Sequence, residues 1–415
     1  MKPVVRIVDQ RAYEPEEIRS RVRRLLEADD LRVRRKSVFL KPSFVYPARP
    51  PLNRGVNTQP EFVGGVVQAL RDLGASDVWV GEDCLGGSSA VAFHAMGVLP
   101  WLKGAATPLF LDRERRVDVS VPDPFVEGRF RLPASLLNAD LFISLPKLKV
   151  NMHSGLTLSA KNHMGLLIRS DRLTHHDFRL HQKIADLYRA RVPDYVLADA
   201  IVSGEGQGPM HARPVETGVI VAGRTGVAVD AVSCRLMGLE PGAVPHLVHL
   251  HERGCGPIAR ADIEIDGEGL LGERARRFQP PRTGFSDCPP TMRFFVGARR
   301  ACPEGCLGMI RGTVDHWARC NHWRPIRDVS FIVGEPHAEQ PGGLPKNRTF
   351  VVGDCAAAWR DLGTFLPGCP VPPLSLLLAL ARKGIMSPLQ TRASDVVIGQ
   401  LRSLLPGWGG RTRRR

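Results

Sequence analysis

The sequence has no long apolar run. Hydrophobic residues make up 43% of its 415 positions, but no uninterrupted stretch approaches the ~20 residues that a membrane-spanning helix needs. The N-terminus, MKPVVRIVDQRAYEPEE, contains neither the apolar segment nor the small-residue cleavage site of a secretory signal. We therefore expect a protein with no membrane span, located in the cytoplasm.

Nucleotide and nucleic-acid motifs are also missing. No GxGxxG turn follows a predicted strand and no GxxxxGK[ST] loop occurs, so neither a nicotinamide nor a nucleoside triphosphate is indicated as a cofactor. The net charge is +15, yet helix-turn-helix spacing and aromatic residues interleaved with basic ones are absent. We therefore expect the positive field to attract small anions rather than nucleic acid.

Alternating strand and helix signals predict an α/β fold. SVFLKP is typical of a buried strand, and a capping box at Thr58 and Glu61 opens a helix that ends at Gly74. SDVWVGED then reads as a second strand, so the order strand, helix, strand indicates a parallel unit. The same pattern recurs in ADLFISLPKLK, DYVLADAIV and VETGVIVAG. The sequence therefore predicts a mostly parallel sheet flanked by helices.

A change in composition marks a boundary near residue 280. RRFQPPRTGFSDCPP lacks periodicity and is rich in proline and arginine. Beyond it, MRFFVGA, DVSFIVG and RTFVVGD predict strands, and residues 373–383 predict a helix. We expect an α/β domain over 1–280, a smaller cysteine-bearing α/β domain over 281–400, and a basic tail over 401–415.

The run LFISLPKLKVNMHSGLTLSAKNHMGLL is predicted to be a strand that ends at Leu145, followed by a polar, lysine-rich loop. Loops beyond the carboxyl ends of parallel strands build ligand sites, and lysines suit phosphate or carboxylate. The expected ligand is a small anionic substrate. Its predicted binding residues are Lys41, Lys147, Lys149 and Asn162. A solvated loop without a specific role is the alternative.

Lys161, predicted to be exposed in the same loop, is a candidate catalytic residue because an amine can act as a nucleophile or proton carrier. Three carboxylates that follow predicted strands are candidate general acids and bases: Glu82, Asp199 and Glu205. The alternative is that the acidic residues of this region, Asp199 and also Asp230, cap turns or helices.

Four segments, LPKLK, SGLTLSAKNHMG, VLADAIVSGEGQGP and TGVAVDAVSCRLMGLEP, resemble in order the signature runs of the domain of unknown function 362 family, over residues 36–265. The loop is also distantly similar to the nickel-pincer lactate racemases. That comparison places Lys161 at the position of their cofactor-bearing lysine, although the glycine pair and the Pro-Gly of the racemases are absent. A redox-neutral isomerase is what this second resemblance implies.

Most of the nine cysteines lie in the last third of the chain, in CPEGC, VVGDC and LPGCPVPP among other segments. Soft thiolates on loops around a small sheet suit an iron–sulfur cluster. PGCPVPPLSLLLALARKG also resembles the cluster-binding run in the small subunits of respiratory complex I and nickel–iron hydrogenases. The predicted ligands of a [4Fe–4S] cluster are Cys302, Cys306, Cys355 and Cys369, with Cys288 and Cys320 in reserve. Structural zinc and unligated thiols are the alternatives.

These features together lead to the hypothesis of an iron–sulfur oxidoreductase. Its cluster would face the Lys161 loop, with the anionic substrate bound between the two domains. A non-catalytic electron carrier or sensor with an electron-transfer or regulatory partner is the second hypothesis, and the racemase-like isomerase is the third.

Overall fold

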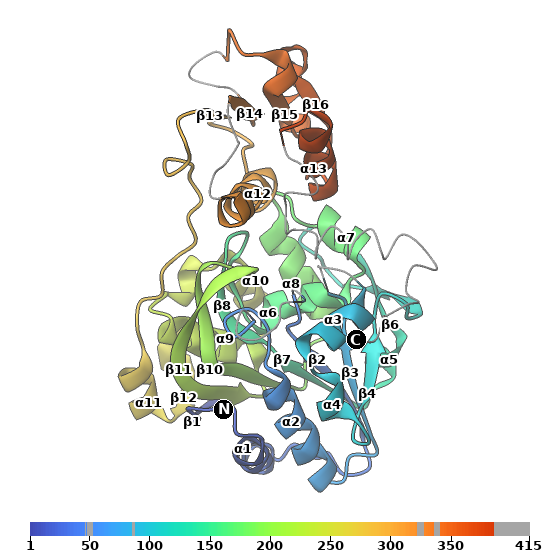
Figure 1. Ribbon diagram of the computed structural model, residues 1–415. Helices are drawn as coiled ribbons and strands as arrows, with labels where there is room; N and C mark the ends of the chain where they lie inside the picture. The colour runs from blue at the N-terminus through green and yellow to red at the C-terminus, as the bar shows by residue number, and fades with distance from the viewer. Residues whose placement is uncertain (46, 48–52, 85–87, 322–327, 336–340, 386–415) are drawn as a thin grey trace, which may run out of the picture. The chain divides into compact units, whose positions relative to one another are not determined.

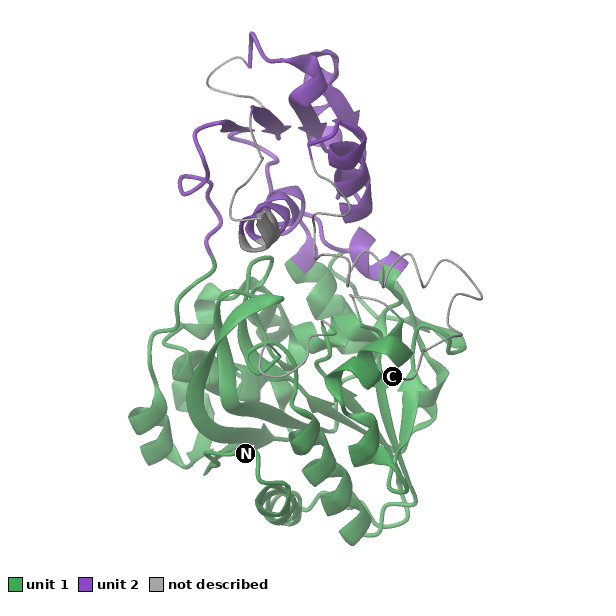
Figure 2. Ribbon diagram, in the orientation of Figure 1, with its two compact units in different colours: residues 1–169, 181–281 green, residues 170–180, 282–415 purple. Residues whose placement is uncertain are grey.

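The computed structural model describes residues 1–45, 47, 53–84, 88–321, 328–335 and 341–385. The predicted basic tail, 401–415, lies outside these residues. The chain divides into two compact units, one of residues 1–169 and 181–281, the other of residues 170–180 and 282–415 (Figure 2). Residues 170–180 therefore join the second unit although the first unit surrounds them in the sequence.

A mixed sheet forms the centre of the first unit (Figure 1). Its main path runs through β12 (Glu264–Asp266), β1 (Val4–Asp9), β11 (His211–Gly223), β10 (Tyr195–Gln207), β7 (Leu141–Leu145), β2 (Ser37–Pro42), β3 (Asp77–Glu82) and β4 (Thr107–Phe110). The strands from β10 to β4 are parallel. The predicted α/β fold with a largely parallel sheet is confirmed.

One strand breaks the predicted pattern. VETGVIVAG lies in β11, which pairs antiparallel with both β10 and β1. Only three residues, 208–210, connect β10 to β11. A parallel pair needs a longer crossover, so this connection permits only a hairpin.

Helices cover both faces of the sheet. On one face, Val38 and Leu40 pack in the same core as the buried sides of α1 (Pro15–Ala28) and α2 (Pro60–Asp72), which lie side by side. The alternate residue Phe39 packs against Phe142. On that other side, α9 (Gly226–Leu236) contacts β10 and β11 and is almost entirely buried.

The helix predicted after the first strand is α2, but the predicted capping box is wrong. Its N-terminal flanking residue is Gln59, which makes no side-chain cap. The Thr58 hydroxyl instead accepts from the Ser43 N–H at 2.9 Å and donates to the Leu145 carbonyl at 2.8 Å. Thr58 therefore ties the loop after β2 to the end of β7.

The strand order reverses between β2 and β7. From β2 the chain proceeds outward through β3 to β4, and then returns to the opposite side of β2 as β7. In open α/β sheets, ligands bind beyond the carboxyl ends of the strands at such a reversal. A ligand site is therefore expected at this edge of the first unit.

The second unit contains a parallel four-stranded sheet of its own. Its strands are β13 (Met292–Val296), β14 (Val329–Val333), β15 (Thr349–Val352) and β16 (Thr364–Leu366), and its helices include α12 (Cys306–Asn321) and α13 (Pro373–Arg382). The three strands and the helix predicted here are confirmed. Ile310 and Leu376, from the two helices, pack with Phe331 and Phe350 in one core.

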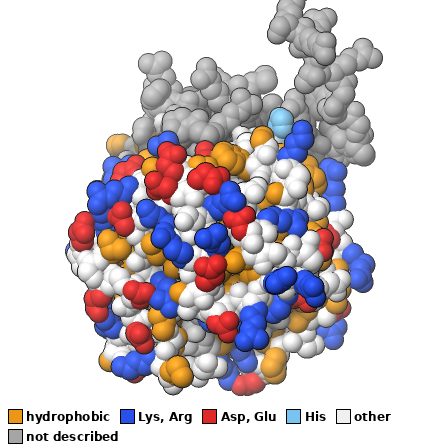
Figure 3. All heavy atoms as spheres, turned by 90° about the horizontal axis from the view of Figure 1, so that it is seen from below, with side chains coloured by type: hydrophobic (Ala, Val, Ile, Leu, Met, Phe, Trp, Pro, Cys, Tyr) orange, Lys and Arg blue, Asp and Glu red, His pale blue; other side chains and the backbone are white. Residues whose placement is uncertain are grey.

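One face of the described surface mixes charges of both signs (Figure 3). In the view of Figure 3, lysine and arginine side chains alternate with aspartate and glutamate. This face therefore carries no extended patch of one sign. None of the helices in the described ranges is long and apolar enough to cross a membrane.

Candidate functional site

A buried ion pair joins the carboxyl ends of β2 and β3. Lys41 Nζ lies 2.8 Å from Glu82 Oε2, and the two side chains are 1% and 3% exposed. The Phe44 N–H donates to the same carboxylate oxygen at 2.9 Å, and the Asp83 N–H donates to Oε1 at 3.0 Å. The Glu82 carboxylate therefore accepts hydrogen bonds from several donors, and its negative charge balances the positive charge of Lys41.

A second buried ion pair joins β10 to β8 (Lys147–Asn151). Lys147 Nζ lies 2.8 Å from Asp199 Oδ2, and both side chains are fully buried. Tyr13 completes the group, because its hydroxyl donates to Asp199 Oδ1 at 2.8 Å and accepts from Lys147 at 2.7 Å. No sequence pattern pointed to Tyr13, which lies 186 positions from Asp199.

Lys149 differs from these two lysines in the partners of its amine. Nζ donates to the Ser43 hydroxyl at 3.2 Å and to the Val56 carbonyl, and both acceptors are uncharged. Burial, with a contribution from the charge of Lys147, lowers the pKa of Lys149 to about 7. Lys149 can therefore gain and lose a proton near neutral pH, as groups at active sites often do.

Asn162 and Gly165 both lie beside the Lys41–Glu82 pair, at the strand-order reversal. Asn162 Nδ2 donates to the Lys41 carbonyl at 2.9 Å and to Ser144 Oγ at 3.1 Å, which joins β2 to β7. A Cβ added to Gly165 would lie 2.0 Å from Glu82 Oε1 and 2.6 Å from Lys41 Nζ. The backbone at Gly165 therefore covers the Lys41–Glu82 pair and leaves no room for a side chain.

The prediction of a polar loop at these lysines is wrong. Residues 147–151 form β8, which pairs with β9 (Gly155–Thr157) and with β10. Both lysines of β8 are fully buried, so the alternative of a solvated loop is wrong as well. Carboxylates distant in sequence make this burial tolerable for Lys41 and Lys147, because a paired charge costs far less to bury than an isolated one.

Lys161 belongs to a different group of residues. It lies on α6 (Ser159–Asn162) and is only 6% exposed, so the expectation of an exposed loop lysine is wrong. Its charge acts on two histidines, His181 and His246. The N-terminus of α6 is capped by Asp230, whose carboxylate accepts from the Ser159 and Ala160 N–H groups at 2.8 and 2.9 Å. The capping interpretation of Asp230 is confirmed.

Glu205 lies on β10, and its carboxylate is held by two arginines. Arg213 Nη2 lies 3.0 Å from Oε1 and Arg276 Nη2 lies 3.3 Å from Oε2, and the Gln279 N–H donates to Oε2 at 2.9 Å. These contacts attach the segment before residue 281 to β10. They indicate a structural role for Glu205.

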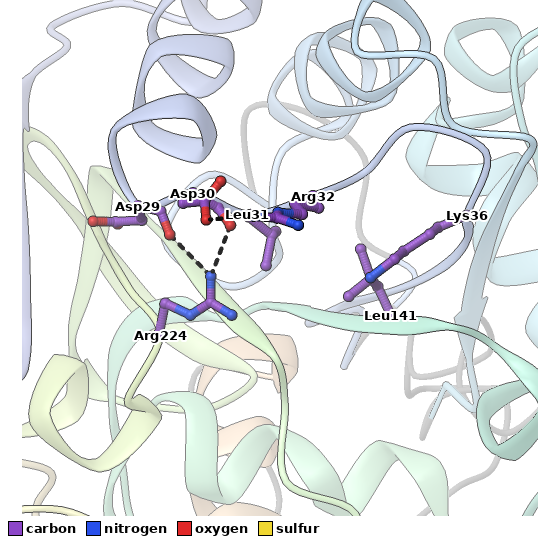
Figure 4. Close-up of a pocket in the computed structure, with 7 residues that line it drawn as sticks. All are labelled: Asp29, Asp30, Leu31, Arg32, Lys36, Leu141 and Arg224. Carbon is purple, nitrogen blue, oxygen red and sulfur yellow. Dashed lines mark hydrogen bonds and ion pairs between the residues drawn. The ribbon is translucent and has the colours of Figure 1, made fainter.

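A surface pocket of about 400 Å³ opens at the other edge of the sheet (Figure 4). It lies beside the amino ends of β2 and β7 and is lined by Asp29, Asp30, Leu31, Arg32, Lys36, Leu141 and Arg224. Arg224 Nη1 donates to the carbonyls of Asp29 and Asp30 at 2.9 and 3.3 Å. Because the titratable cluster lies at the carboxyl ends, we place the candidate site there and not in this pocket.

Four cysteines of the second unit follow three strands of its parallel sheet. CPEGC follows β13 and leads into α12, Cys355 follows β15, and Cys369 follows β16. Burial, followed by the charges of Cys302, Cys355 and Cys369, raises the pKa of Cys306 to about 12. The Val371 N–H lies 3.5 Å from Cys306 Sγ.

Among the described residues, no group of three or more His, Cys, Asp or Glu side chains is placed to hold a metal ion. Cys288 contacts Arg311, whose Nη1 lies 3.7 Å from its sulfur. Cys320 lies on α12, but its side chain is outside the described residues.

Comparisons with known proteins match part of this chain. A thylakoid-associated protein of Synechocystis sp. is 29% identical over 228 residues, which are 54% of this chain and 69% of that protein. Two solved structures are distant. The lactate racemase apoprotein from Thermoanaerobacterium thermosaccharolyticum is 13% identical with a TM-score of 0.36, and a protein from Thermotoga maritima is 10% identical with a TM-score of 0.31.

The alignments with these structures cover 54% and 60% of this chain. This chain spans somewhat over half the length of each structure, 54% and 59%. The family model that matches is that of the domain of unknown function DUF362. Residues 38–235, which carry both buried ion pairs, Lys149 and Lys161, match this family.

Proposed function

We propose that this is an iron–sulfur redox protein whose second unit binds a [4Fe–4S] cluster. The four ligands are Cys302, Cys306, Cys355 and Cys369. The observation that carries the proposal is that Cys306 lies within electrostatic reach of the other three thiols although Cys355 and Cys369 are distant in sequence. Such a cluster exchanges single electrons.

Gly353 supports the same grouping. A Cβ added there would lie 3.3 Å from Cys355 Sγ and 3.5 Å from Cys306 Sγ, so the two sulfurs are no farther apart than the sum of these distances. The glycine has a positive φ of 92°, which side chains rarely adopt. Because Gly353 has no side chain, the space between the two sulfurs stays open.

Backbone amides are directed at the thiols as well. Burial raises the pKa of Cys302, and the N–H groups of Cys306 and Gly305 oppose that rise by donating to its sulfur. Hydrogen bonds to cluster sulfurs are one of the means by which proteins set a cluster's potential. A bound cation would also stabilise thiolates that burial disfavours.

A single zinc ion, with Zn–S bonds of ~2.3 Å, is the alternative occupant of these thiolates. A cubane of four irons accepts thiolates that are more widely spaced. The metal content of the protein therefore separates the two.

One observation favours an enzyme over an electron carrier or sensor. Lys149, with its pKa of about 7, lies in a buried cluster at the strand-order reversal, where substrates of α/β enzymes bind. Lys41 and Lys147 already have carboxylate partners, so in this proposal they organise the site and do not themselves bind the small anionic substrate. An isomerase would need no electrons from the cluster, which would then be structural.

Cysteine variants prepared without oxygen test the cluster. We expect wild-type protein to contain about four irons and four sulfides per chain, as a cubane requires. Serine at each of the four proposed positions should lower the iron content strongly, whereas Cys288→Ser is the matched control and should retain it. Stoichiometric zinc without iron, or equal iron in the Cys355→Ser and Cys288→Ser variants, would contradict the proposal.

A further inference from the structure

The loops that carry Cys355 and Cys369 follow neighbouring strands at the same level of the sheet. β15 and β16 are parallel, and their register pairs Val352 with Leu366. Cys355 lies three positions beyond Val352, and Cys369 lies three positions beyond Leu366. Paired parallel strands end at the same edge of a sheet, so both cysteine loops begin there side by side.

Hydrogen bonds continue this pairing beyond the ends of the strands. The Gly353 N–H donates to the Leu366 carbonyl at 2.9 Å, and the Asp354 N–H donates to the Gly368 carbonyl at 3.2 Å. In return, the Gly368 N–H donates to Asp354 Oδ1 at 2.7 Å. Asp354 and Gly368 are the residues directly before the two cysteines. One backbone bond and one side-chain bond therefore join the two loops next to the proposed ligands.

Asp354 and Gly368 both suit this contact. Gly368 has a positive φ of 129°, and a Cβ added there would lie 2.8 Å from the Pro370 carbonyl oxygen, so the turn into the cysteine requires a glycine. The Asp354 residue is exposed, so packing does not explain its place in the loop. Its carboxylate is a charged acceptor, which binds an N–H more strongly than a neutral oxygen does.

We propose that Asp354 is a positioning residue of the metal centre, and that its carboxylate holds the Cys369 loop beside the Cys355 loop so that both thiolates bind one cluster. This inference rests on the proposed function, because it assigns Asp354 a role toward that cluster. A negative charge next to a ligand also disfavours the addition of an electron. Asp354 therefore lowers the reduction potential of the centre that it positions.

Two substitutions separate the hydrogen bond from the charge. Asp354→Asn keeps an oxygen that accepts from Gly368, whereas Asp354→Ala removes both the acceptor and the charge. The readout is the rate at which the full chain, purified without oxygen, loses iron to a chelator. We expect Asp354→Ala to lose iron about tenfold faster than the wild type, the effect of one charge-assisted hydrogen bond. Asp354→Asn should lose it less than about threefold faster.

Asp361 supplies the matched control, because it is an exposed aspartate between the same two strands. Asp361→Ala should lose iron at the wild-type rate, and equal rates in Asp361→Ala and Asp354→Ala would overturn the proposal. The potential tests whether the carboxylate lies beside the cluster. In Asp354→Asn we expect the equilibrium between oxidised and reduced cluster to shift about threefold toward the reduced form. An unchanged potential in this variant would refute the assignment.

The outcomes distinguish this inference from the proposed function. If the wild type carries zinc and no iron, the redox proposal fails, and faster loss of zinc from Asp354→Ala would still support the positioning role. If four irons are bound and Asp354→Ala retains them as Asp361→Ala does, only the positioning role fails. Hydrogen exchange across β15 and β16 shows whether Asp354→Ala folds. If it does not fold, the potential of Asp354→Asn decides.

Discussion

Replacing Lys41 by methionine tests whether the buried ion pairs hold the first unit together. The substitution keeps a side chain of similar length but removes the amine, which donates to Glu82 at 2.8 Å, to the Pro42 carbonyl at 2.8 Å and to Asn162 at 3.3 Å. Glu82 is then left buried without its cation. Breaking a buried pair in this way costs about 3–5 kcal/mol of unfolding free energy.

The measurement must report the first unit by itself, because the unfolding of a chain with two compact units need not be two-state. Hydrogen–deuterium exchange in increasing urea, followed by mass spectrometry, reports β2 and β3 apart from the second unit. Arg23→Ala is the control, since Arg23 and Glu27 form an exposed pair at 3.7 Å whose loss should cost less than about 1 kcal/mol.

A double variant tests whether the unpaired charge of Glu82 causes the loss of stability. In Lys41→Met/Glu82→Gln no unpaired carboxylate remains, so we expect it to be more stable than Lys41→Met alone. If Lys41→Met costs no more than Arg23→Ala, the pair does not stabilise the fold as we argue. A double variant less stable than the single one would show that packing and not charge dominates.

Three further predictions concern the same unit. Burial holds the pKa of Lys149 at about 7, below its ordinary 10.5, so the unfolded chain binds the extra proton between these values and stability should rise with pH across that range. Lys149→Met should abolish this rise in urea titrations, and an unchanged slope would show that another group causes it. Gly165→Ala should cost roughly 3 kcal/mol because its Cβ would meet Glu82, whereas Gly242→Ala, with open space around it, should cost little in the same titrations. Asp230→Ala removes two hydrogen bonds from the first turn of α6 and should cost about 1–2 kcal/mol, seen as faster amide exchange at residues 159 and 160; unchanged exchange would refute the capping role.

Periodic apolar patterns predicted much of the fold. The strand–helix–strand unit from β2 to β3 and the strands β13, β14 and β15 follow from buried apolar runs separated by turn residues. The antiparallel β11 was missed because the direction of a strand depends on its connection, and GQGPMH carries no pattern that separates a hairpin from a crossover.

The candidate site was harder to predict, because its chemistry depends on pairs that are distant in the chain. Lys41 meets Glu82 across 41 positions and Lys147 meets Asp199 across 52, so no local pattern shows that these lysines are buried and paired. A lysine-rich run is expected to be exposed to solvent unless carboxylate partners for its lysines are known. His246 had no signal either, since it is one of three histidines in the helix Pro245–Glu252 and no local pattern shows which of them is buried.

The [4Fe–4S] cluster that we propose for the second unit makes a definite prediction about the number of irons bound. Mössbauer spectroscopy of wild-type protein, grown on ⁵⁷Fe and purified without oxygen, tests it most directly. We predict the spectrum of one four-iron cluster per chain, which is lost in Cys355→Ser and kept in Cys288→Ser. A mononuclear iron signal, or protein that carries zinc and no iron, would contradict the account.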